Sequence, residues 1–115
     1  MEKNLKYSAL LSIYGGLLTD KQLETMEYYY DEDLSLGEIA ENTGISRQGA
    51  RDFIKRAEEL LDLYEEKIGL YEKMKYVAKI EDCAEEIKNI NLGAWSNKNI
   101  EKLADNIIEA AHKLR

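Results

Sequence analysis

Apolar residues recur at alternating steps of three and four along most of the chain, a spacing that fits one face of an α-helix. The longest series runs through Ile54, Ala57, Leu61, Tyr64, Ile68 and Tyr71. None of the 115 residues is proline, and only seven are glycine, so the chain lacks the turn residues of a sandwich or barrel. We therefore expect an all-α protein, and a chain of this length has room for one domain.

Polar caps and glycines divide this pattern into separate helices. A first helix is expected over residues 5–14, and the starts of the later helices are marked by Thr19 with Gln22, Ser35 with Glu38, Ser46, and Ser96 or Asn97. Gly44 is expected to end the third helix in a tight turn. At Gly69 the pattern fits a kink or short break and a continuous rod equally well.

The chain is interpreted as one domain over residues 1–115 with two parts. Residues 1–68 are expected to form a compact head, with its recognition helix starting at residue 46, and residues 69–115 a long helical extension. The extension is a candidate for dimerisation. An apolar stripe of Tyr64, Ile68, Tyr71 and Met74 fits a core against the last helix or a dimer seam, and we favour a homodimer.

Charge is distributed unevenly along the chain. The 23 acidic residues outnumber the 16 Lys and Arg, which gives a formal charge of -7 and excludes a generally polybasic nucleic-acid binder. Residues 19–34 hold six acids and one base, whereas residues 35–56 hold three acids and four bases. The segment 35–56 is therefore where an anionic partner is most easily accommodated.

The segment from Leu36 to Lys55 fits a helix-turn-helix. Gly44 is suited to the positive φ of the sharp turn, and a small residue at Ala40 allows the second helix to cross closely above the first. The inward-facing residues that would set the angle between the helices are Ile39, Ile45, Ala50 and Phe53. We expect the second helix to be a recognition helix.

With Ala50 and Phe53 facing inward, the polar side chains of the same helix face outward. The candidate nucleic-acid contacts are Thr43, Ser46, Arg47, Gln48, Arg51, Lys55 and Arg56. In a major groove Arg47 or Arg51 suits guanine and Gln48 suits adenine, while the hydroxyls and remaining cations suit phosphates. Asp52 lies on the same face and opposes binding. The alternative is a helix-turn-helix retained for folding or for binding a protein.

Residues 17–73 resemble the YlxM-like family of small bacterial proteins. The most specific parts are the strings YYYDEDLSLGEIAE at 28–41 and YEEKIGLYEK at 64–73. The helix-turn-helix is also similar to region four of bacterial sigma factors, which docks on promoter DNA through a matching Ser-Arg-Gln stretch. Many relatives have a bulky residue such as Tyr where this chain has Arg51.

The resemblance implies a DNA-binding regulatory protein with a part in the signal recognition particle pathway. Its partners would be DNA, or the protein or RNA of that particle. The alternative is an adaptor of the particle that does not read DNA sequence.

Other function classes find little support in the sequence. Cys83 and His112 cannot make a zinc site together, no cofactor is implied, and no nucleophile with a matching base can be argued, so we expect no enzyme. No apolar run is long enough to span a membrane, and a cytoplasmic location is expected. Cys83 is interpreted as a small buried hydrophobe, and Trp95 as a plug over the last helix junction.

Overall fold

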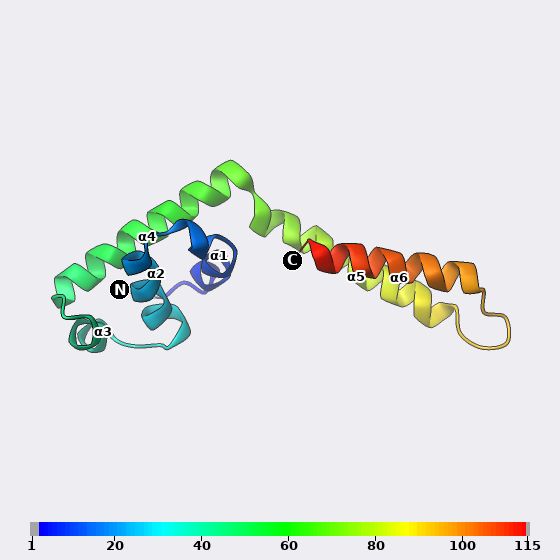
Figure 1. Ribbon diagram of the computed structural model, residues 1–115, viewed down its shortest axis with the longest axis horizontal. Coiled ribbons are helices and arrows are strands. Elements are labelled where there is room, and N and C mark those ends of the chain that lie inside the picture. Colours follow the sequence, from blue (N-terminus) through cyan, green and yellow to red (C-terminus); the bar gives the residue numbers. More distant parts are fainter. Residues whose placement is uncertain (1–2, 115) are drawn as a thin grey trace. The chain divides into compact units, whose positions relative to one another are not determined.

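The computed structural model describes residues 3–114, and this part of the chain contains six α-helices and no strand (Figure 1). The prediction of an all-α protein is confirmed. The helices are α1 (Lys6–Tyr14), α2 (Asp20–Met26), α3 (Leu36–Thr43), α4 (Arg47–Ile68), α5 (Leu70–Ile90) and α6 (Lys98–Lys113). Two short segments add to them, a 3₁₀ turn η1 (Gly15–Leu17) and a π-helical turn η2 (Glu27–Asp31). The chain divides into two compact units, residues 1–71 and residues 72–115.

The predicted capping boxes begin α2 and α3. Thr19 Oγ1 accepts from the backbone N–H of Gln22 at 3.2 Å, and the Gln22 side chain accepts from the N–H of Thr19 at 3.0 Å. Ser35 and Glu38 make the same reciprocal pair at 3.2 and 3.1 Å. Because each box satisfies two backbone donors that the helix leaves unpaired, both helix starts are fixed locally by the sequence.

The core of the first unit is built around α4, against which α1, α2 and α3 all pack. Three residues of its inner stripe, Ile54, Ala57 and Leu61, have no exposed surface. The neighbouring elements cover this stripe with Leu10, Leu11, Tyr14, Leu18, Met26, Tyr29 and Ile39. Tyr29 is buried and Tyr28 and Tyr30 are half-buried, so the run of three tyrosines contributes to this core.

The helix of residues 47–90 breaks at Gly69. This residue has φ of +71° and ends α4 with its N–H bonded to the carbonyl of Glu65 at 2.9 Å, after which α5 starts at Leu70. The first N–H groups of α5 are satisfied by side chains, because Leu70 N donates to Tyr14 Oη at 2.9 Å and Tyr71 N donates to Glu65 Oε1 at 3.0 Å. Tyr14 in turn donates its hydroxyl hydrogen to Glu65 Oε1 at 2.7 Å. One buried tyrosine thus links α1 to the helix break.

The apolar stripe around this break is placed differently from the seam that the sequence favoured. Tyr64 and Tyr71 pack against the core of the first unit, and the Tyr64 ring lies 6.0 Å from that of Tyr14. Ile68 is 42% exposed. The two tyrosines are therefore used, at least on one side, within the chain.

The second unit is a hairpin in which α5 and α6 lie side by side (Figure 1). Its inner seam is made of small residues, Val77 and Ala84 on α5 and Ala104 and Ala111 on α6. Lys88 Nζ and Asp105 Oδ1 pair across the hairpin at 2.7 Å. Asn91 closes the connecting loop by two hydrogen bonds of 2.8 Å to the backbone of Asn97, which also caps α6.

Two expectations for this unit are wrong. Trp95 is 96% exposed in the connecting loop and covers no helix junction. Cys83 lies exposed on α5. The physical reason is the same for both residues, because a hairpin of two helices has one internal seam and no further layer that could bury them.

Titratable groups gather where α1 meets α4. Tyr7 donates its hydroxyl hydrogen to Asp62 Oδ2 at 2.7 Å, and Lys6 Nζ lies 3.2 Å from Asp62 Oδ1. Burial raises the pKa of the Glu58 carboxyl, and the negative charge of Asp62 raises that pKa further. The ionised form of Glu58 therefore opposes folding.

Tyr14→Phe is expected to lower the free energy of unfolding by about 1 to 3 kcal/mol, because it removes the partner of Leu70 N and one partner of Glu65 inside a buried site. Urea unfolding followed by circular dichroism measures the loss. Tyr76→Phe, at a 62% exposed tyrosine, is the matched control and should change little. Equal effects of the two variants would show that the Tyr14 hydroxyl does not support the helix break.

Glu58→Gln is expected to stabilise the fold at neutral pH, where the raised pKa means that the wild-type carboxylate is held ionised at a cost. As the pH falls below the pKa of Glu58 in the folded protein, towards its ordinary value of 4.5, the carboxylate becomes protonated and its destabilising effect disappears. The difference in stability between Glu58→Gln and wild type should therefore shrink in this pH range. Urea midpoints measured between neutral pH and this value test the trend. Glu59→Gln, at the exposed neighbour, is the control. A constant difference between Glu58→Gln and wild type at every pH would contradict the assignment.

Candidate nucleic-acid interface

The segment α3, turn and α4 forms the predicted helix-turn-helix. Gly44 ends α3 at φ of +75°, and its N–H bonds the carbonyl of Ala40 at 3.0 Å. Two residues later Ser46 is extended, and its Oγ accepts from Gly49 N at 2.9 Å to begin α4. The positive φ and the Ser46 cap turn the chain sharply between the two helices.

The inner side of this motif differs from the prediction at one residue. Ile39 and Ala50 are fully buried, and Ile45 packs against the same core while half-buried. Phe53 was expected to face inward, yet it is half-buried and lines a surface depression with Gly49, Asp52 and Arg56. Its neighbour Ile54 has no exposed surface, because the buried stripe of α4 passes through residues 50, 54, 57 and 61.

The outer side of the motif brings the candidate contacts onto one surface. Six of the seven are exposed, Ser46, Arg47, Gln48, Arg51, Lys55 and Arg56, and all of these lie in the first turns of α4 or at its cap. Thr43 is half-buried at the end of α3. The recognition helix therefore starts with a row of exposed hydrogen-bonding and cationic side chains.

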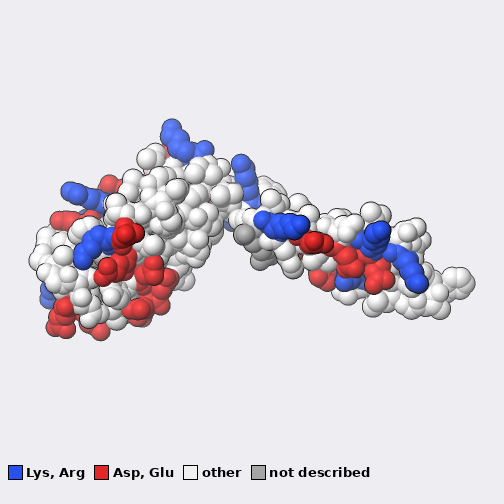
Figure 2. Space-filling view, in the orientation of Figure 1, with Lys and Arg blue, Asp and Glu red and all other residues white. Residues whose placement is uncertain are grey.

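The cations of this surface form no close ion pair with an acid among the described residues. Arg47, Arg51, Lys55 and Arg56 lie in none of the ion pairs found among residues 3–114, and of the four only Lys55 has a charge interaction with a nearby acid, Glu58. Acidic side chains gather over α3 and the segment before it, as Figure 2 shows. An anion approaching the molecule is thus favoured at the start of α4 and repelled beside it.

Asp52 has a role that sequence reasoning did not find. Gln48 Nε2 donates to Asp52 Oδ1 at 3.1 Å, one turn along α4. This bond holds the Gln48 amide in one orientation and leaves its second N–H and its carbonyl available, the pair of groups that reads adenine. The spacing of four residues between a Gln and an Asp on one helix was the available signal.

The Arg47 side chain lies close to Gly37, a contact that the sequence did not predict. A Cβ built at this position would lie 3.7 Å from Nε and 3.8 Å from Cζ of Arg47. The Arg47 guanidinium therefore lies over the first turn of α3, where an alanine would make an ordinary van der Waals contact with it.

The two hydroxyls of the interface differ in what they can still donate. Thr43 donates its hydroxyl hydrogen to the Ile39 carbonyl at 2.7 Å, so a bond to phosphate would replace one within α3. Ser46 uses its oxygen as an acceptor in the cap, which leaves its hydrogen for an anion. Ser46 is the better placed of the two.

Two further observations concern residues 3–114. No helix in this range is long and apolar enough to cross a membrane. No group of three or more His, Cys, Asp or Glu side chains in it is arranged to hold a metal ion.

Comparison with known proteins identifies the family. The model of the family UPF0122, described as "Putative helix-turn-helix protein, YlxM / p13 like", matches residues 1–107. A UPF0122 protein of Caldanaerobacter subterraneus subsp. tengcongensis is 52% identical over 88 residues, which are 72% of this chain and 75% of the relative. One from Clostridium kluyveri is 46% identical over 103 residues, 90% of each chain. One from Clostridium perfringens SM101 is 45% identical over 112 residues, 96% of this chain and 100% of the relative. The chain belongs to this bacterial helix-turn-helix family, as the resemblance implied.

Gly44→Ala is expected to destabilise the head by about 1 to 2 kcal/mol, because φ of +75° is costly for a residue with a Cβ. The loss is measured by urea unfolding. Gly16→Ala is the matched control, since Gly16 has no positive φ and no atom within 4 Å of an added Cβ. A loss at residue 44 no larger than at residue 16 would show that the turn tolerates the substitution.

Proposed function

We propose that this protein is a DNA-binding regulator that places the start of α4 in a major groove. The observation that carries the proposal is the row of exposed cations on a recognition helix that is capped by Ser46 and follows a left-handed turn at Gly44. None of these cations is held in a close ion pair among the described residues, so all four can contact phosphates or base edges, and Lys55 would do so beside Glu58.

The proposed roles follow from the position of each side chain. Arg47 and Arg51 suit guanine, which a guanidinium can bond at two atoms, and Gln48, oriented by Asp52, suits adenine. Phosphates would be bound by Thr43, Ser46, Lys55 and Arg56. These seven residues form the proposed interface.

The overall charge limits how such binding can work. A net charge of -7 makes non-specific attraction to DNA weak, so most of the electrostatic affinity must come from the four cations of the recognition helix. Binding is therefore expected to depend steeply on a few residues.

The domain organisation, oligomeric state, location and pathway of the protein are proposed from the family resemblance and the fold. We propose one domain made of a head at residues 1–68 and an extension at 69–115, acting without catalysis as a homodimer in the cytoplasm, with a part in the signal recognition particle pathway. Pairing of two copies would double the DNA footprint.

Replacing both Arg47 and Arg51 with Ala is expected to lower the affinity for selected DNA by about 10- to 100-fold and to reduce the preference for the selected sites over unrelated duplex. The protein is first used to enrich binding sites from a random duplex library, and fluorescence anisotropy then gives the affinity for selected and unrelated duplex at several salt concentrations.

Lys98→Ala with Lys102→Ala is the matched control, because it removes two exposed cations outside the interface. An unchanged affinity of the arginine variant would reject the assigned face. A second outcome would favour an adaptor of the signal recognition particle over a DNA-binding regulator. In that outcome no DNA site is enriched, and both wild type and the arginine variant recover RNA or protein of the particle from a cell lysate.

A further inference from the structure

The hairpin of α5 and α6 presents a long apolar face to solvent. On α5 the residues Tyr76, Ile80, Cys83 and Ile87 follow one another at steps of four, three and four, and on α6 the apolar series is Ile100, Leu103, Ile107, Ala110 and Leu114. The large side chains of both series are between 40% and 66% exposed, and Cys83 is exposed too. These residues are defined as the hairpin face.

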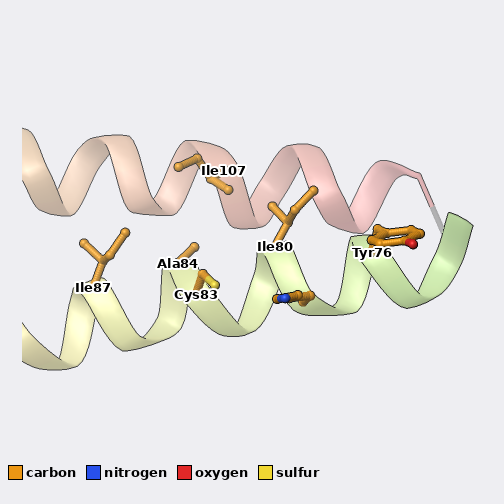
Figure 3. A pocket seen from close by; sticks show the side chains of 7 residues that line it. Tyr76, Ile80, Cys83, Ala84, Ile87 and Ile107 are labelled. Atoms are coloured by element: carbon orange, nitrogen blue, oxygen red, sulfur yellow. The ribbon is translucent and has the colours of Figure 1, made fainter.

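A groove runs along the α5 side of this face and reaches Ile107 of α6. Its volume is about 370 Å³, and it is lined by Tyr76, Lys79, Ile80, Cys83, Ala84, Ile87 and Ile107 (Figure 3). Lys79 is the single charged residue among them. A continuous apolar surface of this kind is unusual in a chain with 34% charged residues and marks a contact with another molecule.

The spacing of the face shows which type of element would cover it. Alternating steps of three and four place apolar side chains along one line of a helix, where they interlock with a second helix by knobs-into-holes packing. Two such lines side by side form one layer of a four-helix bundle. The missing layer is a second pair of helices.

The charges of α5 indicate that this second layer is another copy of the same chain. Residues 70–79 hold three bases and one acid, whereas residues 80–90 hold four acids and one base. A helix with this polarity is complementary to itself in an antiparallel arrangement, because each basic half then meets an acidic half. A partner of uniform charge would be attracted by one half and repelled by the other.

We propose that the hairpin face pairs with the same face of a second copy, with α5 antiparallel to α5 and the twofold axis between Ile80 and Cys83. In this register Ile80 packs against Cys83 of the second copy, and Tyr76 packs against its Ile87. The inference specifies the homodimer proposed above and moves its seam from the stripe around Gly69 to the hairpin face.

This register also places a lysine of each copy beside a glutamate of the other, so that the same ion pair forms twice. Lys79 and Glu86 border the α5 line on the side away from α6, both are exposed, and neither takes part in an ion pair with another of residues 3–114. Antiparallel packing places Lys79 beside Glu86 of the second copy, and symmetry repeats the contact.

Sedimentation equilibrium of the full-length chain, without nucleic acid and from about 1 to about 100 μM, tests the association. Wild type is expected to be a dimer, and Ile80→Glu is expected to raise the dissociation constant at least about tenfold with unchanged helix content. Leu63→Glu is the control, since Leu63 is 44% exposed on α4, outside the face. A monomeric wild type, or equal association of wild type and Ile80→Glu, would overturn the proposal.

A charge exchange tests the direction of pairing without touching the apolar residues. Lys79→Glu and Glu86→Lys are each expected to weaken the dimer about three- to tenfold, and the double variant should return to within about twofold of wild type. A double variant as weak as the singles overturns the antiparallel register.

Cross-linking gives an independent readout, because Cys83 is the single cysteine of the chain. A short bis-maleimide should join two wild-type chains rapidly, and dimers that form without this cross-link would contradict a seam at Cys83. All of these measurements omit DNA, so their failure leaves the proposed DNA contacts untouched.

Discussion

The buried stripe of α4 is the constraint on which the first unit depends. Ile54, Ala57 and Leu61 lose all contact with solvent because α1, α2 and α3 converge on them, and none of those shorter helices would be stable in water alone. The same helix fixes its outer surface, since burial of Ala50 and Ile54 turns Arg51 and Lys55 outward. The helical repeat that buries one face of α4 in the core therefore also determines which side chains of α4 form the candidate interface.

The surface charge gives that interface its character. The net charge of the chain is -7, so the four cations at the start of α4 form a small positive surface that cannot act through bulk attraction. Local hydrogen bonds become more important in such a setting. The bond from Gln48 to Asp52 restricts a polar side chain before any partner arrives, which lowers the entropy that binding would cost.

The sequence was sufficient wherever structure is determined by neighbouring residues. The capping boxes at Thr19 and Ser35, the left-handed turn at Gly44 and the cap at Ser46 were all predictable, because each involves groups within a few positions of one another. The break at Gly69 was undecided, since its outcome depends on Tyr14, which lies 55 residues earlier in the chain. Phe53 was misplaced for a similar reason, because residues three apart point in directions that differ by about 60°, and only the packing of neighbouring helices decides which is buried.

In the second unit the spacing of apolar residues did not predict which of them are buried. Its apolar series were regular enough to predict α5 and α6, yet a regular series specifies a face and does not specify what covers it. With Val77, Ala84, Ala104 and Ala111 filling the internal seam, the larger residues of both helices remain outside. A two-helix hairpin has too little interior for them, so the exposed positions of Ile80, Cys83 and Ile107 are a consequence of having two helices in the layer. The apolar surface that this leaves is the one we propose a second copy to cover, and in that case association would be coupled to the stability of this unit.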